Sequence, residues 1–272
     1  MPDTSLLSPY VVKLDGGLIL NRDSFSMPPG AALELINFEP DISGGYRRIN
    51  GFSKYNSNIV PQTSASTEKV LGVAIYKGNI IAARGEKVFK GGTTGSWTAI
   101  QTGRTNAERY SFVVYNFDNT EKIIYVDGAN NAAIFNNSSV SAVNTTGAPA
   151  DPSTVALHKN HMFFAGMSSN PHEIVFSAPF SETDFSAANG AGSIRVDSSV
   201  VQLVTFRNSL FIFCEDQIHQ LTGTSIADFQ LQPVTRRIGC VSQHSVQELG
   251  GDIIYLAPDG LRTLATGQVV AD

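Results

Sequence analysis

Two pairs of acidic residues come nearest to the side chains of a catalytic site. Glu182 precedes Asp184 by two positions, and Glu215 is followed directly by Asp216. A glycosidase needs two carboxyl groups that face each other across a cleft. Side chains of adjacent residues on a strand point apart. We therefore interpret both pairs as solvated turns without a catalytic role.

Two histidines raise the question of a metal site. His158 and His161 flank the two-residue turn Lys159-Asn160, but no cysteine or carboxylate completes a ligand set with the usual spacing. We expect surface histidines beside a hairpin turn. Asp127-Gly128 and Asp259-Gly260 are typical of hairpin turns, whereas a calcium loop needs a denser ladder of acidic residues. The sequence predicts neither a metal nor a cofactor.

The motifs of common hydrolases and nucleotide-binding proteins are missing. Residues 94–97, Thr-Gly-Ser-Trp, match half of the Asp-box of sialidase propellers, but its aspartate is absent. The sequence contains neither a Gly-x-Ser-x-Gly elbow nor a P-loop. We therefore expect a protein that is not an enzyme.

Residues 200–234 set the pattern for much of the chain. Three runs rich in β-branched and aromatic residues, 201–206, 210–214 and 217–222, are separated by polar pairs, and a fourth run covers 226–234. The breaks are too short for helices, which predicts an antiparallel meander. The second run is apolar throughout, as in a strand buried on both faces, whereas the third alternates like a half-exposed outer strand.

The same unit recurs along the chain. A Ser or Thr four residues before an aromatic residue ends three copies, at Trp97, Phe185 and Phe229. The last two endings define a period of about 44 residues, and the first two lie twice as far apart because a degenerate copy ends near residue 141. A repeat of this length with four strands indicates a β-propeller. We predict an all-β fold of about five four-stranded blades over residues 70–272.

Composition agrees with a turn-rich β protein. Of the 272 residues, 42% are hydrophobic and 16% are charged. The net charge is −5, whereas a dedicated nucleic-acid binder usually carries a basic face. No apolar run approaches the length of a membrane span, and residues 1–7 lack the features of a signal peptide. For Cys214 and Cys240 we expect buried free thiols rather than a disulfide.

The first 55 residues do not follow the blade pattern. Residues 10–14 predict a strand, and Pro28-Pro29-Gly30 before the Ala- and Leu-rich stretch 31–38 predicts one short helix. Residues 46–52 predict an exposed edge strand. A linker rich in Ser, Thr and Asn, 56–69, leads into the propeller.

The repeat also predicts how the propeller closes. The ending after Phe229 falls just past Asp272, so the fifth blade has three strands. Counting one period back from Trp97 reaches Phe52, at the end of the strand 46–52. We expect this strand to pair with residues 261–265, since propellers avoid an open edge of backbone groups. Seven inner-strand residues should be buried: Val73, Ile75, Ile124, Phe163, Phe211, Phe213 and Ile254.

Several stretches in sequence order carry a family resemblance. They are Gly16-Gly17, Pro28-Pro29-Gly30-Ala31, Asn37-Phe38-Glu39 and Gly44-Gly45-Tyr46-Arg47-Arg48-Ile49-Asn50-Gly51-Phe52, with residues 238–242, 250–256 and 259–261 further on. Together they resemble the tail nozzle proteins of short-tailed phages, also called tail tubular protein B. None of these stretches is a catalytic motif.

The resemblance implies a structural role in a virion. In that family, propeller domains form a ring around the channel through which DNA leaves, so we expect copies of this chain in a ring, a hexamer by resemblance. Other tail proteins are the further partners, and DNA passes without specific binding. The chain would be made in the host cytoplasm and located in the virion tail.

Six residues are candidate contacts in such an assembly. They are Tyr46, Arg47, Arg48 and Phe52 in the resembling stretch, and Arg236 and Arg237, the second basic pair. Each basic pair either contacts an acidic surface or a phosphate, or is simply solvated.

The rival function is a carbohydrate-binding or carbohydrate-acting propeller in a receptor-recognition component of a tail. An exposed aromatic cluster with convergent carboxylates would favour it. A ring contact made by residues 10–55 would favour the structural role.

Overall fold

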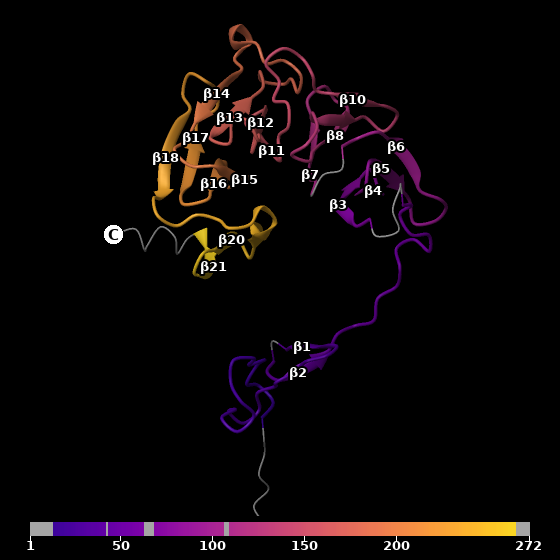
Figure 1. The fold of residues 1–272 in the computed structure, drawn as a ribbon, viewed down its shortest axis with the longest axis vertical. Helices are drawn as coiled ribbons and strands as arrows, with labels where there is room; N and C mark the ends of the chain where they lie inside the picture. The colour runs from indigo at the N-terminus through magenta and orange to yellow at the C-terminus, as the bar shows by residue number, and fades with distance from the viewer. Residues whose placement is uncertain (1–12, 42, 63–67, 106–108, 265–272) are drawn as a thin grey trace, which may run out of the picture. The chain divides into compact units, whose positions relative to one another are not determined.

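The computed structural model describes residues 13–41, 43–62, 68–105 and 109–264. The chain divides into two compact units, residues 1–55 and 56–272 (Figure 1).

The first unit contains one antiparallel pair of short strands. β1 (Phe38–Pro40) pairs with β2 (Tyr46–Arg48), with Phe38 opposite Arg48. The turn between them passes through Gly44 and Gly45, both with positive φ, and Asp41 N donates a hydrogen bond of 3.0 Å to Gly45 O. No side chain that the structure describes in this unit is buried.

The helix predicted over residues 31–38 does not form. Ala32 makes a parallel bridge with Leu18, and its N–H donates to Gly17 O at 2.9 Å. Gly30, just before the stretch, and Asn37, within it, have left-handed backbone, at φ 81° and 59°. So short a segment is only marginally helical without tertiary packing. The prediction was wrong because Ala32 bonds to the segment around Leu18 and because Gly30 and Asn37 adopt non-helical backbone angles.

The two strands predicted in this unit have different outcomes. The strand over 46–52 is confirmed for its first three residues, which form β2. Of the strand over 10–14, residues 10–12 lie outside the described residues, and residues 13 and 14 are irregular. One edge of β2 is taken by β1. The pairing of 46–52 with 261–265 stays a prediction.

The second unit consists of five antiparallel sheets, which follow one another in chain order in Figure 1. Sheet 1 contains β3 (Val70–Tyr76), β4 (Asn79–Arg84), β5 (Lys87–Gly91) and β6 (Thr98–Gln101). Sheet 2 contains β7 (Ser111–Asn116), β8 (Glu121–Val126), β9 (Ala133–Phe135) and β10 (Val140–Ala142). Sheet 3 contains β11 (Thr154–His158), β12 (His161–Ala165), β13 (Glu173–Phe176) and β14 (Gly192–Arg195). Sheet 4 contains β15 (Val200–Phe206), β16 (Ser209–Cys214), β17 (Ile218–Thr222) and β18 (Gln230–Thr235), and sheet 5 contains β19 (Gln247–Leu249), β20 (Asp252–Ala257) and β21 (Gly260–Thr263).

Each sheet is a meander whose strands pair in sequence order, and this confirms the predicted propeller of about five blades. Three strands of the fifth sheet are described, and the predicted lack of a fourth concerns residues 265–272, which lie outside the described residues. Two short 3-10 helices, η1 (Ala187–Asn189) and η2 (Gln243–Ser245), lie between strands of the second unit.

The turn between the first two strands is nearly the same in four of the sheets. Lys77-Gly78, Lys159-Asn160, Arg207-Asn208 and Gly250-Gly251 each have positive φ at both residues. Positive φ at both positions is the type I′ geometry, whose twist matches that of the flanking strands. These turns fix the register of the inner strand pairs.

The repeated aromatic motif lies just before the outer strand. Trp97 and Phe229 directly precede β6 and β18. In the last copy, Asp228 Oδ1 accepts hydrogen bonds from Thr224 N at 2.9 Å and Ser225 N at 2.7 Å. These bonds lower the pKa of Asp228 to about 2. The motif is therefore a structural turn that introduces the fourth strand.

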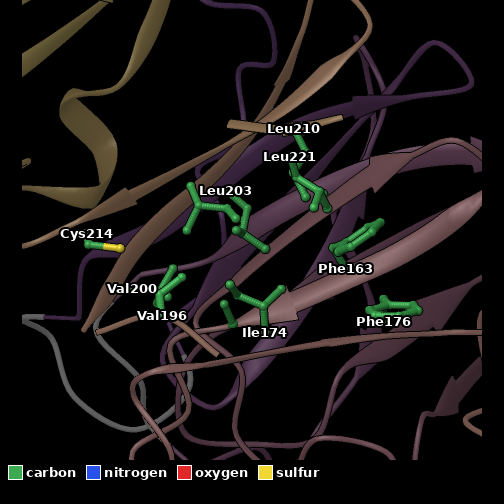
Figure 2. Close-up of a cluster of buried hydrophobic side chains, with 12 residues drawn as sticks. Phe163, Ile174, Phe176, Val196, Val200, Leu203, Leu210, Cys214 and Leu221 are labelled. Atoms are coloured by element: carbon green, nitrogen blue, oxygen red, sulfur yellow. The ribbon is translucent and has the colours of Figure 1, made fainter. Parts of the chain in front are cut away.

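Successive sheets pack through clusters of buried apolar side chains. Figure 2 shows the cluster between sheets 3 and 4, where Phe163 and Ile174 lie near Leu203 and Leu221. Equivalent clusters join sheets 1 and 2, sheets 2 and 3, and sheets 4 and 5. Burying one such side chain contributes roughly 1.5–3 kcal/mol. These four interfaces hold the five sheets together.

The predicted core is only partly correct. Ile124, Phe163, Phe211 and Phe213 are buried, Ile254 is half-buried, and Val73 and Ile75 are 56% and 75% exposed. The prediction was wrong for Val73 and Ile75 because side chains alternate along β3. Ala74 and Tyr76 face sheet 2, so Val73 and Ile75 point to the opposite face of sheet 1.

Both cysteines are buried and free, in agreement with the prediction. Cys240 N donates a hydrogen bond of 2.8 Å to Cys214 O. Burial raises the pKa of the Cys214 thiol to about 12, and Asp216 and Glu215 add to this effect. Cys214 is therefore an unreactive core residue.

Candidate functional site

The candidate interface residues belong to different units of the chain. In the first unit, the Tyr46 hydroxyl donates a hydrogen bond to Gly17 O at 2.9 Å, so this side chain stabilises the fold of the first unit. Arg47 Nε lies 2.7 Å from Glu39 Oε1, across the β1–β2 pair. Arg48 is exposed, and Phe52 is 93% exposed.

The second basic pair lies in the propeller unit. Arg236 and Arg237 follow β18 in a turn, and both are exposed. An exposed guanidinium suits contact with an acidic partner surface or with a phosphate.

The acidic pair Glu182 and Asp184 has structural contacts. Glu182 Oε1 accepts a hydrogen bond from Lys122 Nζ at 2.8 Å, and Lys122 Nζ also lies 3.0 Å from Asp118. Burial lowers the pKa of Lys122, but the hydrogen bonds to Glu182 and Asp118 outweigh it and raise the pKa overall. Asp184 accepts from Ser186 N at 2.8 Å and from Asn189 Nδ2 at 2.6 Å. The two carboxylates hold separate turns.

The two histidines are buried, which corrects the prediction of surface histidines. They lie opposite each other on β11 and β12 and are 2% and 1% exposed. His161 Nδ1 donates to Ser177 O at 2.6 Å, and the His161 ring lies 5.6 Å from the Phe176 ring. Burial, then Lys159 and His161, lower the pKa of His158 to about 4. The prediction was wrong because both side chains pack with core aromatic rings.

The structure contains a buried ion pair that no sequence pattern predicted. Arg104 Nη2 lies 2.6 Å from Asp127 Oδ2, and both side chains are almost completely buried. The Arg104 guanidinium also lies over the rings of Tyr110 and Tyr125, 5.5 and 5.3 Å from their centroids. Burial raises the pKa of Tyr110 to about 12, although Arg104 opposes the effect. The pair joins the loop after β6 to the loop after β8.

A polar hollow of about 610 Å³ lies beside this ion pair. Amide and hydroxyl groups of Gln101, Asn130, Asn131 and Ser168 line it, together with Asp151. Asp151 Oδ1 is buried without a hydrogen-bond partner. Such groups can donate to and accept from the hydroxyls of a sugar. Among the described residues, no group of three or more His, Cys, Asp or Glu side chains could hold a metal ion.

The first unit exposes large apolar side chains. Phe25 is 101% exposed and Phe52 93% exposed, and Leu14, Leu20 and Ile36 are also exposed. Leu14, Ile36 and Phe38 line an apolar hollow of about 490 Å³ in this unit. A unit of about 55 residues buries too little surface to build a large core. The described part of this unit therefore leaves many of its apolar side chains exposed.

Sheet 5 has one apolar face directed away from sheet 4. Ile253 and Tyr255 point toward sheet 4, where they join its buried cluster. Leu256 lies opposite Leu261, on the other face. Leu261 is 75% exposed, and Leu249, which shares this face through its register with β20, is 65% exposed.

Neither a protein-family model nor a curated protein sequence matches the chain. Among solved structures, the extracellular domain of a one-component system from B. thetaiotaomicron is similar, with a TM-score of 0.54 and 12% identity. The match covers 76% of this chain and 28% of that domain's chain. Sqt1 of Saccharomyces cerevisiae matches with a TM-score of 0.49 and 12% identity, over 83% of this chain and 64% of its own. At such identities the first similarity establishes a shared fold and nothing about activity.

Within the described part of the chain, no helix has the length and apolar character needed to cross a membrane.

Proposed function

We propose that this protein is a non-enzymatic structural component of a phage tail, similar to a tail nozzle, that assembles into a ring around the DNA exit channel. The observation that carries the proposal is the first unit. It contains the first four of the stretches that resemble nozzle proteins, and it exposes apolar side chains such as Phe25 and Phe52. Exposed apolar surface of this kind marks a protein–protein interface.

The contacts of the acidic residues support a structural role. Glu182 pairs with Lys122, and Asp184 accepts from the backbone of Ser186. These carboxylates fix turns of the propeller, and a rigid propeller can present its loops to neighbouring subunits. A net charge of −5 suits a channel past which DNA slides, since DNA affinity depends on phosphate neutralisation by Lys and Arg.

The location of the chain in a virion tests this proposal. Antibody-labelled tailed particles that contain the chain should carry the label at the distal end of the tail in electron micrographs. Label on the head, or tailed particles that lack the chain, would overturn the proposal.

A hydrolysis assay tests the non-enzymatic part. The purified protein should release no products from polysaccharides or peptidoglycan. Turnover that Glu182→Gln or Asp184→Asn abolishes, while the thermal midpoint is unchanged, would contradict the proposal and favour a carbohydrate-acting enzyme.

A carbohydrate-binding propeller is the second candidate, and the polar hollow near Asn130 and Asp151 is the observation that favours it. Saturable binding of a glycan that Asn131→Ala removes would favour this candidate. Asn144→Ala, in an exposed turn outside the hollow, is the control and should leave such binding unchanged.

A further inference from the structure

A further hollow adjoins the polar hollow beside Arg104 and Asp127. It has a volume of about 450 Å³ and lies between the segment 147–150, which links sheets 2 and 3, and the outer strands of sheet 3 (Figure 1). Ala150 and Ser169 line both hollows, and both residues are exposed. A ligand can therefore pass over them from one hollow into the other. We call the two hollows together the long groove, and all of its lining residues belong to the propeller unit.

The segment that forms one wall of the long groove is held by hydrogen bonds within the chain. Val143 N donates to Ala132 O at 2.8 Å. Ala148 N donates to Thr145 O at 3.0 Å, and Thr145 Oγ1 donates to Thr183 O in the loop before η1. The wall is therefore in place before a ligand binds, and this reduces the ordering cost of binding.

One carboxylate oxygen in the first hollow has no hydrogen-bond partner among the described residues. Asp151 Oδ2 accepts from the Ser168 backbone N–H at 3.3 Å and also from the Ser168 hydroxyl. Asp151 Oδ1 is buried and unpartnered. A buried oxygen without a donor is costly, and a ligand is one source of the donor. A hydroxyl or an amide N–H of a ligand can fill this role.

The second hollow contributes a carboxylate of its own. Glu173 Oε2 lies 3.8 Å from Arg195 Nη2, and the Arg195 side chain is largely exposed. An exposed pair of this kind is weak, so Glu173 remains able to accept from a ligand. Among the residues that line the long groove, Arg104 is the one basic side chain, and Asp127 neutralises it. This charge distribution disfavours an acidic ligand and favours a neutral one that is rich in donors.

The second hollow also offers apolar surface beside its polar groups. Val175 and Ser193 lie opposite each other on β13 and β14, and Phe185 lines the same hollow. The C–H face of a sugar ring can pack on Val175 and Phe185, while its hydroxyls bond to Ser193 and Glu173. Sites for small molecules combine apolar walls with a few polar groups in this way.

We propose that the long groove binds a neutral oligosaccharide chain, with one end at Asp151 and Asn131 and the other end between Glu173 and Phe185. The inference rests on the second candidate function, a carbohydrate-binding propeller. It adds that the ligand is a chain of sugar residues, because two connected hollows, each within the range of about 300–1,000 Å³ for small-molecule pockets, exceed what one sugar residue fills.

Titration calorimetry with oligosaccharides of increasing length tests the inference. The probes are the glucose, mannose and N-acetylglucosamine series, each from the monosaccharide to the hexasaccharide. In at least one series the affinity should rise at least about tenfold between the monosaccharide and the tetrasaccharide. Tetragalacturonate, an acidic chain, should bind at least about tenfold more weakly than the neutral tetrasaccharide, because Asp151 and Glu173 repel it.

A bulky substitution in the second hollow gives a second readout. Ser193 is exposed and lines the second hollow but not the first. Ser193→Trp should therefore lower the affinity for the tetrasaccharide at least about tenfold and leave the thermal midpoint unchanged. Ser141→Trp is the matched control, since Ser141 is an exposed serine on the outer strand β10 and lines neither hollow. It should bind the tetrasaccharide like the wild type.

The outcomes separate this inference from the second candidate function. Binding that Asn131→Ala removes, but that depends neither on chain length nor on Ser193→Trp, overturns the chain ligand and leaves a site for a single sugar. Equal losses of affinity in Ser193→Trp and Ser141→Trp also overturn the chain ligand. If none of the three series binds at millimolar concentration, the inference and the second candidate function are both overturned.

Discussion

Arg104 and Asp127 illustrate how single polar residues are held inside this propeller. Asp127 Oδ2 accepts from Arg104 Nε at 2.9 Å and from Asn130 Nδ2 at 2.8 Å, while Oδ1 accepts from the backbone of Ala129 and Asn130. Gln101 Oε1 accepts from Arg104 Nη1 at 3.1 Å. Because the charges are paired and hydrogen-bonded, the site tolerates burial that an isolated charge would not.

The Asp127→Asn variant tests this pair. It leaves the buried Arg104 charge uncompensated, so the free energy of unfolding should fall by about 3–5 kcal/mol in urea titrations. Arg195→Met is the control. Arg195 is largely exposed and lies 3.8 Å from Glu173, so its loss should cost at most about 1 kcal/mol. Equal losses in the two variants would contradict the importance of the buried pair.

His158 predicts a pH dependence of stability. Its pKa is lowered from 6.5 to about 4, mainly by burial. The unfolded chain therefore binds more protons between these values, and stability falls as the pH drops from about 6.5 toward about 4. The loss should be at most about 3 kcal/mol for this group.

The variant His158→Phe provides the comparison for that dependence. It removes the titrating group and keeps an aromatic ring near Phe163, whose ring lies 6.0 Å from that of His158. Denaturation between pH 4 and pH 7 should show a shallower loss of stability than in the wild type, although His219 and His244, whose pKa values are also lowered by burial, still contribute. If the free energy of unfolding of His158→Phe falls with pH as steeply as that of the wild type, the contribution of His158 is contradicted.

The incorrect or missing predictions for single residues, at His158 and at Arg104, have one cause. Whether His158 is buried depends on which face of β11 meets a neighbouring sheet, and a turn-flanking position does not reveal that. Arg104 gave no signal because its partner Asp127 is distant in sequence and belongs to another loop. Contacts between loops of different sheets are set by tertiary packing.

At the scale of elements, turn residues and hydrophobic runs were the patterns that predicted the strands and hairpins. The hairpin residues Lys159-Asn160 and Gly250-Gly251 stand between two strands, as expected, because their left-handed backbone suits type I′ turns. The helix predicted over 31–38 failed because Gly30 and Asn37 adopt left-handed backbone and Ala32 bonds to Gly17. The predicted burial of Val73 and Ile75 was wrong because the periodicity of a strand identifies its two faces but not which face a neighbouring sheet covers.

Phe163→Ala tests the packing between sheets 3 and 4. Phe163 is completely buried, with its ring 5.2 Å from that of Phe176. The substitution leaves a cavity, so the free energy of unfolding should fall by about 3–5 kcal/mol in denaturant titrations. Phe180→Ala, at a position 63% exposed, should cost at most about 1 kcal/mol. A cost for Phe163→Ala no greater than that of the control would contradict the blade packing.

At the scale of the whole molecule, charge and uncovered apolar surface determine the interactions. The chain has a net charge of −5, and its basic pairs are confined to Arg47-Arg48 and Arg236-Arg237. Most of the exposed large apolar side chains lie in the first unit and on the end sheets of the propeller, although Phe180 and Ile226 are also exposed. Both features agree with the proposed association of protein copies and with the proposed weak affinity for nucleic acid.

A DNA-binding measurement tests the charge argument. Double-stranded DNA at physiological salt should show no retention at protein concentrations up to about 10 μM, because few phosphates are neutralised. Arg236→Gln with Arg237→Gln should leave this result unchanged. Tight binding that weakens steeply with added salt would contradict a channel that DNA passes freely.

Electron microscopy of the purified wild-type protein tests the central claim most directly. Class averages at micromolar concentration should show closed rings of identical subunits around an open centre. A wild-type protein that remains monomeric in the averages and in sedimentation at all concentrations would contradict the account.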